Sequence, residues 1–92
     1  MNYTYILECA DHSYYTGWTN DIQKRLQAHN QGKGAKYTKG RTPVKLVYLD
    51  ISATKEEAMK KEAQIKKLTR AQKEALVNAK RLGPDFEQKL FV

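Results

Sequence analysis

The sequence predicts a small α+β domain with the element order strand, strand, helix, strand, helix, helix. Two runs rich in tyrosine and β-branched residues, at 3–9 and 14–19, predict strands, and the short turn between them predicts an antiparallel hairpin. An apolar run at 44–49 predicts a third strand, and two helix-capping signatures after it predict two C-terminal helices. A chain of 92 residues has room for one domain.

Helix starts are marked by residues that accept hydrogen bonds from free backbone N–H groups. Thr19 or Asn20 is the expected N-cap of a helix over 21–30. The capping boxes Thr54-Lys55-Glu56-Glu57 and Thr69-Arg70-Ala71-Gln72 open helices that run to about Leu68 and Arg81.

The strand at 44–49 is apolar on both faces, which predicts a central position in the sheet. Gly83-Pro84 is expected to end the last helix. We therefore expect one domain over residues 1–82 and a C-terminal tail over 83–92.

The charge of the chain predicts a polyanionic partner. Lysine and arginine number 17 against 10 acidic residues, a net charge of +7, and residues 33–45 contain no acidic residue. Such a loop is suited to following a phosphate backbone, although a solubilising surface loop is the alternative. The predicted nucleic-acid contacts are Lys33, Lys36, Tyr37, Lys39 and Arg41, together with Lys66 on the positive outer face of the 54–68 helix.

Several classes of protein are not indicated. The single cysteine, Cys9, fits a small core residue in a reducing compartment, and we find neither a secretion signal nor an apolar run long enough for a membrane, so we expect a cytoplasmic protein. No cysteine–histidine metal cluster, glycine-rich nucleotide loop or serine–histidine–aspartate motif occurs. The aspartates are scattered, which argues against a two-metal carboxylate site.

The helix at 21–30 places Ile22, Arg25, Leu26 and His29 on one face. The two apolar residues should pack on the sheet, with Arg25 and His29 at the margin of the same surface. Arginine there matches phosphate oxygens bidentately. The alternative is an arginine that extends into water and a histidine that fills a gap.

Glu62 lies between Ala58 and Ile65 on the inward stripe of its helix, where an isolated carboxylate would lose hydration. A salt bridge to Arg25, a hydrogen bond to a tyrosine, or a divalent metal would each compensate. Magnesium binds a single carboxylate while keeping waters and substrate phosphate as its other ligands. From the residues alone, a structural ion pair is favoured over a metal.

The order of these residues resembles the GIY-YIG nuclease superfamily, and is most similar to its small single-domain bacterial proteins. Tyr3-Thr4-Tyr5 stands in place of the first triplet and Tyr15-Thr16-Gly17 in place of the second, followed by Arg25, His29 and Glu62. The resemblance covers roughly residues 3–80. The glycine and isoleucine of the first triplet and the isoleucine of the second are replaced here.

This resemblance implies a three-stranded antiparallel sheet flanked by helices, and it implies catalytic roles. Tyr15 would act as general base or orient the attacking water, with Tyr5 and His29 supporting the proton chemistry. Arg25 would stabilise the phosphate. Glu62 would hold one Mg²⁺ or Mn²⁺, which reverses the preference drawn from the residues alone.

The implied activity is metal-dependent DNA cleavage, with a role in repair or recombination on branched, damaged or single-stranded DNA. Affinity should be modest and salt-sensitive unless a protein partner or a dimer supplies more surface. The alternative is a non-catalytic nucleic-acid-binding module, or an adaptor that docks on a larger repair protein through the tail.

Overall fold

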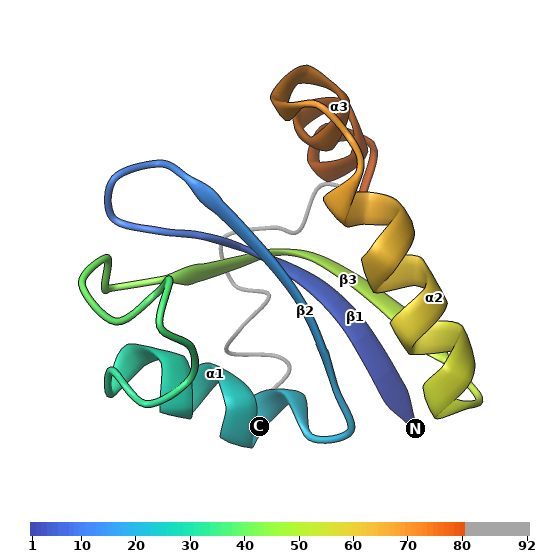
Figure 1. Ribbon diagram of the computed structural model, residues 1–92, viewed down its shortest axis with the longest axis horizontal. Helices are drawn as coiled ribbons and strands as arrows, with labels where there is room; N and C mark the ends of the chain where they lie inside the picture. Colours follow the sequence, from blue (N-terminus) through green and yellow to red (C-terminus); the bar gives the residue numbers. More distant parts are fainter. Residues whose placement is uncertain (81–92) are drawn as a thin grey trace.

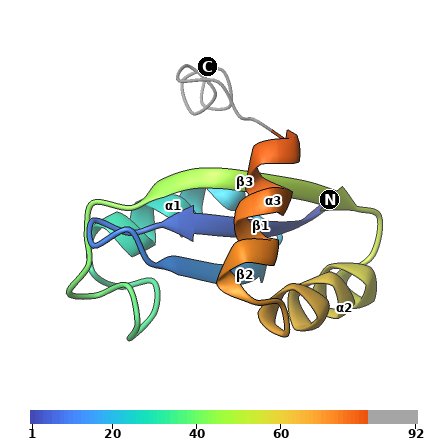
Figure 2. The ribbon, with the colours of Figure 1, turned by 90° about the horizontal axis from the view of Figure 1, so that it is seen from above.

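The computed structural model describes residues 1–80 and contains one antiparallel sheet with helices on both faces (Figures 1 and 2). This confirms the predicted fold class and element order. The elements are β1 (Asn2–Glu8), β2 (Tyr14–Thr19), α1 (Ile22–Asn30), β3 (Lys45–Ser52), α2 (Lys55–Lys66) and α3 (Arg70–Lys80). The predicted tail at 83–92 lies outside the described residues.

The sheet order is β2-β1-β3, so β1 lies in the centre. Tyr5 of β1 pairs with Gly17 of β2 on one side and with Leu49 of β3 on the other. The prediction that the strand at 44–49 is central was therefore wrong. β3 is apolar on both faces because helices cover both faces of the sheet, which is sufficient to bury an outer strand.

Two hydrophobic clusters hold these layers together, one on each face of the sheet. Tyr5 and Leu7 of β1 pack against α1 through Ile22 and Leu26. On the opposite face, the neighbouring Ile6 packs with residues of β3 and α2. The alternation of side chains along β1 thus fixes which helix lies on which face.

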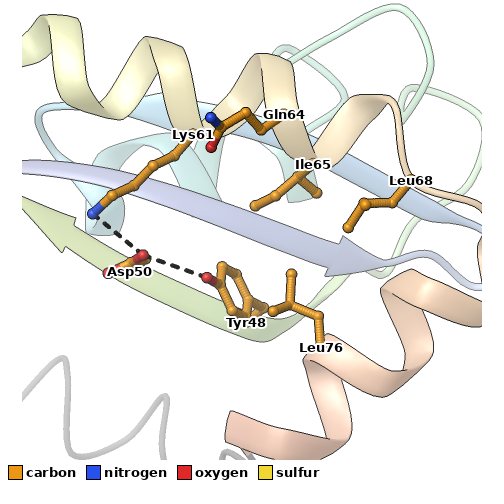
Figure 3. A pocket seen from close by; sticks show the side chains of 7 residues that line it. All are labelled: Tyr48, Asp50, Lys61, Gln64, Ile65, Leu68 and Leu76. Atoms are coloured by element: carbon orange, nitrogen blue, oxygen red, sulfur yellow. Dashed lines mark hydrogen bonds and ion pairs between the residues drawn. The ribbon is translucent and has the colours of Figure 1, made fainter.

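A groove of about 350 Å³ lies on the α2 and α3 face of the sheet (Figure 3). At its polar end, Lys61 Nζ lies 3.3 Å from Asp50 Oδ2, and the Tyr48 hydroxyl donates to the same oxygen at 3.4 Å. Its apolar end includes Ile65 and Leu76. None of the helices in residues 1–80 is long and apolar enough to cross a membrane.

The N-cap of α1 is not one of the two residues that the sequence predicted, and the helix begins one residue later than expected, at Ile22. Asp21 Oδ1 accepts a hydrogen bond from the Lys24 backbone N–H at 3.1 Å, so Asp21 is the N-cap. The expectation of Thr19 or Asn20 was wrong. The Thr19 hydroxyl instead accepts from the Asp21 N–H at 3.1 Å, which fixes the turn before the helix.

The two predicted capping boxes differ in completeness. At α2, Thr54 Oγ1 accepts the Glu57 N–H at 3.2 Å. At α3 the exchange is reciprocal, because Thr69 Oγ1 accepts from the Gln72 N–H at 3.2 Å and Gln72 Oε1 accepts from the Thr69 N–H at 2.9 Å. The start of both α2 and α3 is therefore determined by local sequence.

Candidate active site

A buried chain of polar side chains connects the sheet, α1 and the loop at 31–44. The Tyr5 hydroxyl lies 2.9 Å from His29 Nε2, and His29 Nδ1 lies 2.8 Å from Thr38 Oγ1. His29 is fully buried, so its expected place at the margin of the α1 surface was wrong. The loop folds over the helix and covers the ring, which a helical pattern alone does not reveal.

Two glycines make room for this chain of side chains. A Cβ at Gly17 would lie 2.6 Å from the Tyr5 hydroxyl oxygen, and a Cβ at Gly34 would lie 2.7 Å from His29 Cα and still nearer its ring. Both separations are shorter than van der Waals contact. Gly17 therefore lets Tyr5 cross its neighbouring strand, and Gly34 lets the loop close on His29.

Arg25 lies beside the Tyr5 hydroxyl and is held by the same loop. Its Nη2 donates to the Gly34 carbonyl at 2.5 Å. Burial raises the pKa of Tyr5 to about 12, while a hydrogen bond and charge from Arg25 act in the opposite direction. The charges of Tyr15 and Glu62 add to the rise, which places both near Tyr5. Tyr5 therefore stays a protonated hydroxyl at neutral pH.

His29 is neutral at physiological pH. Burial, followed by the charge of Arg25, lowers its pKa from 6.5 to about 4. A neutral ring donates from one nitrogen and accepts at the other. This protonation state matches a ring with one polar neighbour on each nitrogen.

Acidification should destabilise the fold through His29. Because its pKa is lower in the folded state, the unfolded chain binds more protons between pH 6.5 and about 4. The free energy of unfolding should fall across this window as pH decreases, by up to about 3 kcal/mol from this group. Denaturant titrations of wild type and His29→Gln at several pH values measure the difference. Equal pH slopes for the two proteins would contradict the assignment.

Tyr15 lies between the buried Tyr5–His29–Thr38 series and the surface. Its ring lies 5.2 Å from the His29 ring between centroids and stacks on Tyr37 at 6.0 Å. The Arg41 guanidinium lies 4.1 Å from the Tyr37 centroid. Tyr37 thus contacts both Tyr15 and Arg41 while its side chain remains partly exposed.

The loop at 33–44, called the basic loop below, presents its lysines to solvent. Lys33, Lys36 and Lys39 are exposed. Arg41 is more constrained, because its Nε pairs with Asp11 at 3.0 Å and its Nη1 donates to the Tyr37 carbonyl at 2.5 Å. The loop therefore carries three exposed lysines beside Arg41, whose guanidinium is engaged by protein groups.

Glu62 lies on α2 with its side chain 21% exposed, and its Oε2 is 3.4 Å from Lys66 Nζ. The observed ion pair is thus with Lys66, not with Arg25. Within residues 1–80, no group of three or more histidine, cysteine or acidic residues is placed to hold a metal ion. A single, partly exposed carboxylate fits magnesium or manganese, which would take its other ligands from water and phosphate.

The structure brings Tyr5, Arg25 and His29 into contact, with Tyr15 on the His29 ring and the charge of Glu62 within reach of Tyr5. Residue patterns did not single out Thr38 or Gly34 as part of this site. Both lie in a loop without periodicity, where contacts depend on the path of the chain. The family resemblance extends to Tyr37-Thr38, which points to Thr38 without assigning it a role.

The three-stranded sheet, with this cluster of tyrosines, arginine, histidine and glutamate, defines a GIY-YIG fold. The family model for the GIY-YIG catalytic domain matches residues 1–75, and the chain belongs to this family.

Its relatives carry the name UPF0213. A UPF0213 protein of Clostridium perfringens is 55% identical over 89 residues, covering 97% of this chain and 96% of the relative. One from Halobacterium salinarum is 55% identical over 76 residues, covering 83% of this chain and 99% of the relative. The solution NMR structure of a UPF0213 protein from Bacillus halodurans is similar with a TM-score of 0.59 and 49% identity, covering 96% and 94% of the two chains.

Proposed function

We propose that the protein is a metal-dependent DNA endonuclease that hydrolyses phosphodiester bonds. The observation that carries this proposal is the meeting of Arg25 with the Tyr5–His29 pair, beside Tyr15 and within reach of the Glu62 charge. Membership of the GIY-YIG family supports it. Each side chain has a separate task in phosphodiester hydrolysis.

Arg25 is the phosphate ligand in this proposal. Its guanidinium has five N–H donors, of which one is engaged by the Gly34 carbonyl and another by the Tyr5 hydroxyl. The remaining donors are suited to the non-bridging oxygens of a phosphate, where negative charge grows during attack.

Tyr15 is the better placed of the two tyrosines to act on water. Tyr5 is buried and holds its proton, whereas Tyr15 is only half-buried and its ring borders both His29 and the basic loop. Tyr15 would therefore take the proton of the attacking water, with Tyr5 and His29 positioning it.

Glu62 would hold one Mg²⁺ or Mn²⁺. When bound, that ion would stabilise the charge of the leaving oxygen. Lys66 pairs with the same carboxylate, so ion binding would release Lys66 toward the DNA backbone.

The lysines of the basic loop supply the DNA contact in this proposal. Replacing Lys33, Lys36 and Lys39 together by alanine should weaken binding and reduce the slope of log affinity against log salt by about 1 per lost phosphate contact. Fluorescence anisotropy with a labelled duplex at several salt concentrations measures this slope. Lys60→Ala is the control. Lys60 lies two residues before Glu62 on α2, a spacing that places the two side chains on opposite sides of the helix. An unchanged slope in the triple variant would contradict the assignment.

Metal dependence separates an enzyme from a binding module on the same scaffold. A nuclease should cleave DNA in Mg²⁺ or Mn²⁺, stop in a chelator, and still bind DNA in the chelator. The exposed lysines alone would support binding without cleavage, and that outcome would favour the non-catalytic alternative. We extend the proposal to branched, damaged or single-stranded DNA in repair or recombination, with a protein partner or a dimer supplying further contacts.

A further inference from the structure

The protonation pattern of the buried chain can be read from its donors and acceptors. The Thr38 hydroxyl lies 3.1 Å from the Ala35 carbonyl oxygen and 2.8 Å from His29 Nδ1. A carbonyl oxygen only accepts, and a hydroxyl has one hydrogen to give. Thr38 therefore donates to Ala35, and its oxygen accepts from His29.

This assignment fixes the tautomer of His29. With Nδ1–H donating to Thr38, the other nitrogen of the neutral ring, Nε2, carries a lone pair. The Tyr5 hydroxyl, 2.9 Å away, must then donate its hydrogen to Nε2. The three donors, Tyr5, His29 and Thr38, then point their hydrogens in one direction along the hydrogen-bonded series, which ends at the Ala35 carbonyl.

The direction of these hydrogen bonds matters at Tyr5, where the series meets the proposed active site. A Tyr5 hydroxyl that donates to His29 turns its oxygen lone pairs to the site, where the Arg25 guanidinium, which only donates, lies beside it. In the opposite tautomer, Nε2–H would donate to Tyr5, and the Tyr5 hydrogen would point toward Arg25, which cannot accept it.

We propose that Thr38 is a positioning residue that holds His29 in the Nδ1–H tautomer and thereby orients the Tyr5 hydroxyl toward His29 and its lone pairs toward Arg25. The effect on cleavage rests on the proposed nuclease function, whereas the tautomer does not. Thr38 is fully buried and contacts the ring directly, so its influence passes through His29 and not through DNA.

Nitrogen-15 NMR of the histidine side chains tests the tautomer without any nuclease assay. At pH 7 the wild type should show His29 with a protonated Nδ1 and an unprotonated Nε2. The exposed His12 serves as an internal reference. Thr38→Ser keeps the hydroxyl and should keep this pattern. Thr38→Val removes the acceptor of a buried N–H, so the population should move to Nε2–H.

Cleavage by the same proteins tests the consequence. Thr38→Val should cleave at least about 10-fold more slowly than wild type, a loss of one buried hydrogen bond, with Thr38→Ser restoring most of the rate. Thr38→Ala gives the same comparison if the valine variant does not fold. A wild-type ring protonated on Nε2, or an unchanged tautomer in a folded hydroxyl-free variant, would overturn the proposal. If wild type cleaves no DNA, the nuclease proposal fails while the spectra still decide the tautomer.

Discussion

Replacing Glu62 with glutamine is expected to reduce metal-dependent cleavage by at least about 100-fold, the scale seen when one group that stabilises transition-state charge is removed. Glutamine keeps the size of the side chain but loses the charge that a divalent ion requires. The fold should persist, because the Glu62–Lys66 pair is partly exposed, and ion pairs in contact with solvent are worth less than about 1 kcal/mol. Single-turnover cleavage measures the loss of activity, while circular dichroism and DNA binding show whether the fold and the affinity are retained.

Glu56→Gln is the matched control for this change. Glu56 lies in the first turn of the same helix and is exposed. Glu56→Gln should leave the cleavage rate within about 2-fold of the wild-type rate, as expected for a surface substitution. Cleavage by Glu62→Gln at the wild-type rate would exclude Glu62 as the metal ligand.

Replacing Gly17 with alanine is expected to lower the free energy of unfolding by about 1–3 kcal/mol, the usual cost of forcing a methyl group into a packed core. The added Cβ would lie 2.6 Å from the Tyr5 hydroxyl oxygen and 2.8 Å from its Cζ. Tyr5 is almost fully buried and hydrogen-bonded to His29, so its ring cannot move away without breaking that contact. Denaturant unfolding gives the stability, and cleavage should fall with the loss of the Tyr5–His29 contact.

Gly40→Ala controls for the general effect of replacing a loop or strand glycine. No atom lies within 4 Å of a Cβ at Gly40, so we expect no loss of stability there. If Gly17→Ala were as stable as wild type, and the Tyr5–His29 contact persisted, the packing around Tyr5 would be looser than the structure shows.

The arrangement of elements was predictable because each element has a local signal. The tyrosine-rich hairpin, the capping residues at Thr54 and Thr69, and the shared face of Ile22 and Leu26 were all visible in the sequence and are confirmed. The central place of β1 was not predictable, because an apolar strand covered by helices on both sides looks the same at the centre and at the edge.

The site was predictable in part. The spacing of Arg25 and His29 on one helix face was visible, but the burial of His29 was not, since it depends on a loop that returns over the helix. Thr38 and Gly34 contribute through that return path alone. Residues in irregular segments lack periodicity, and their contacts are decided by tertiary structure.

The most direct test is cleavage of end-labelled duplex, single-stranded, flap and four-way-junction DNA by the wild-type protein in Mg²⁺ or Mn²⁺, with a chelator as the control. We expect at least one DNA shape to be cut in metal and none in chelator, with binding retained in both. Absence of cleavage on every shape, with binding intact, would contradict the nuclease assignment and leave a nucleic-acid-binding module on the GIY-YIG scaffold.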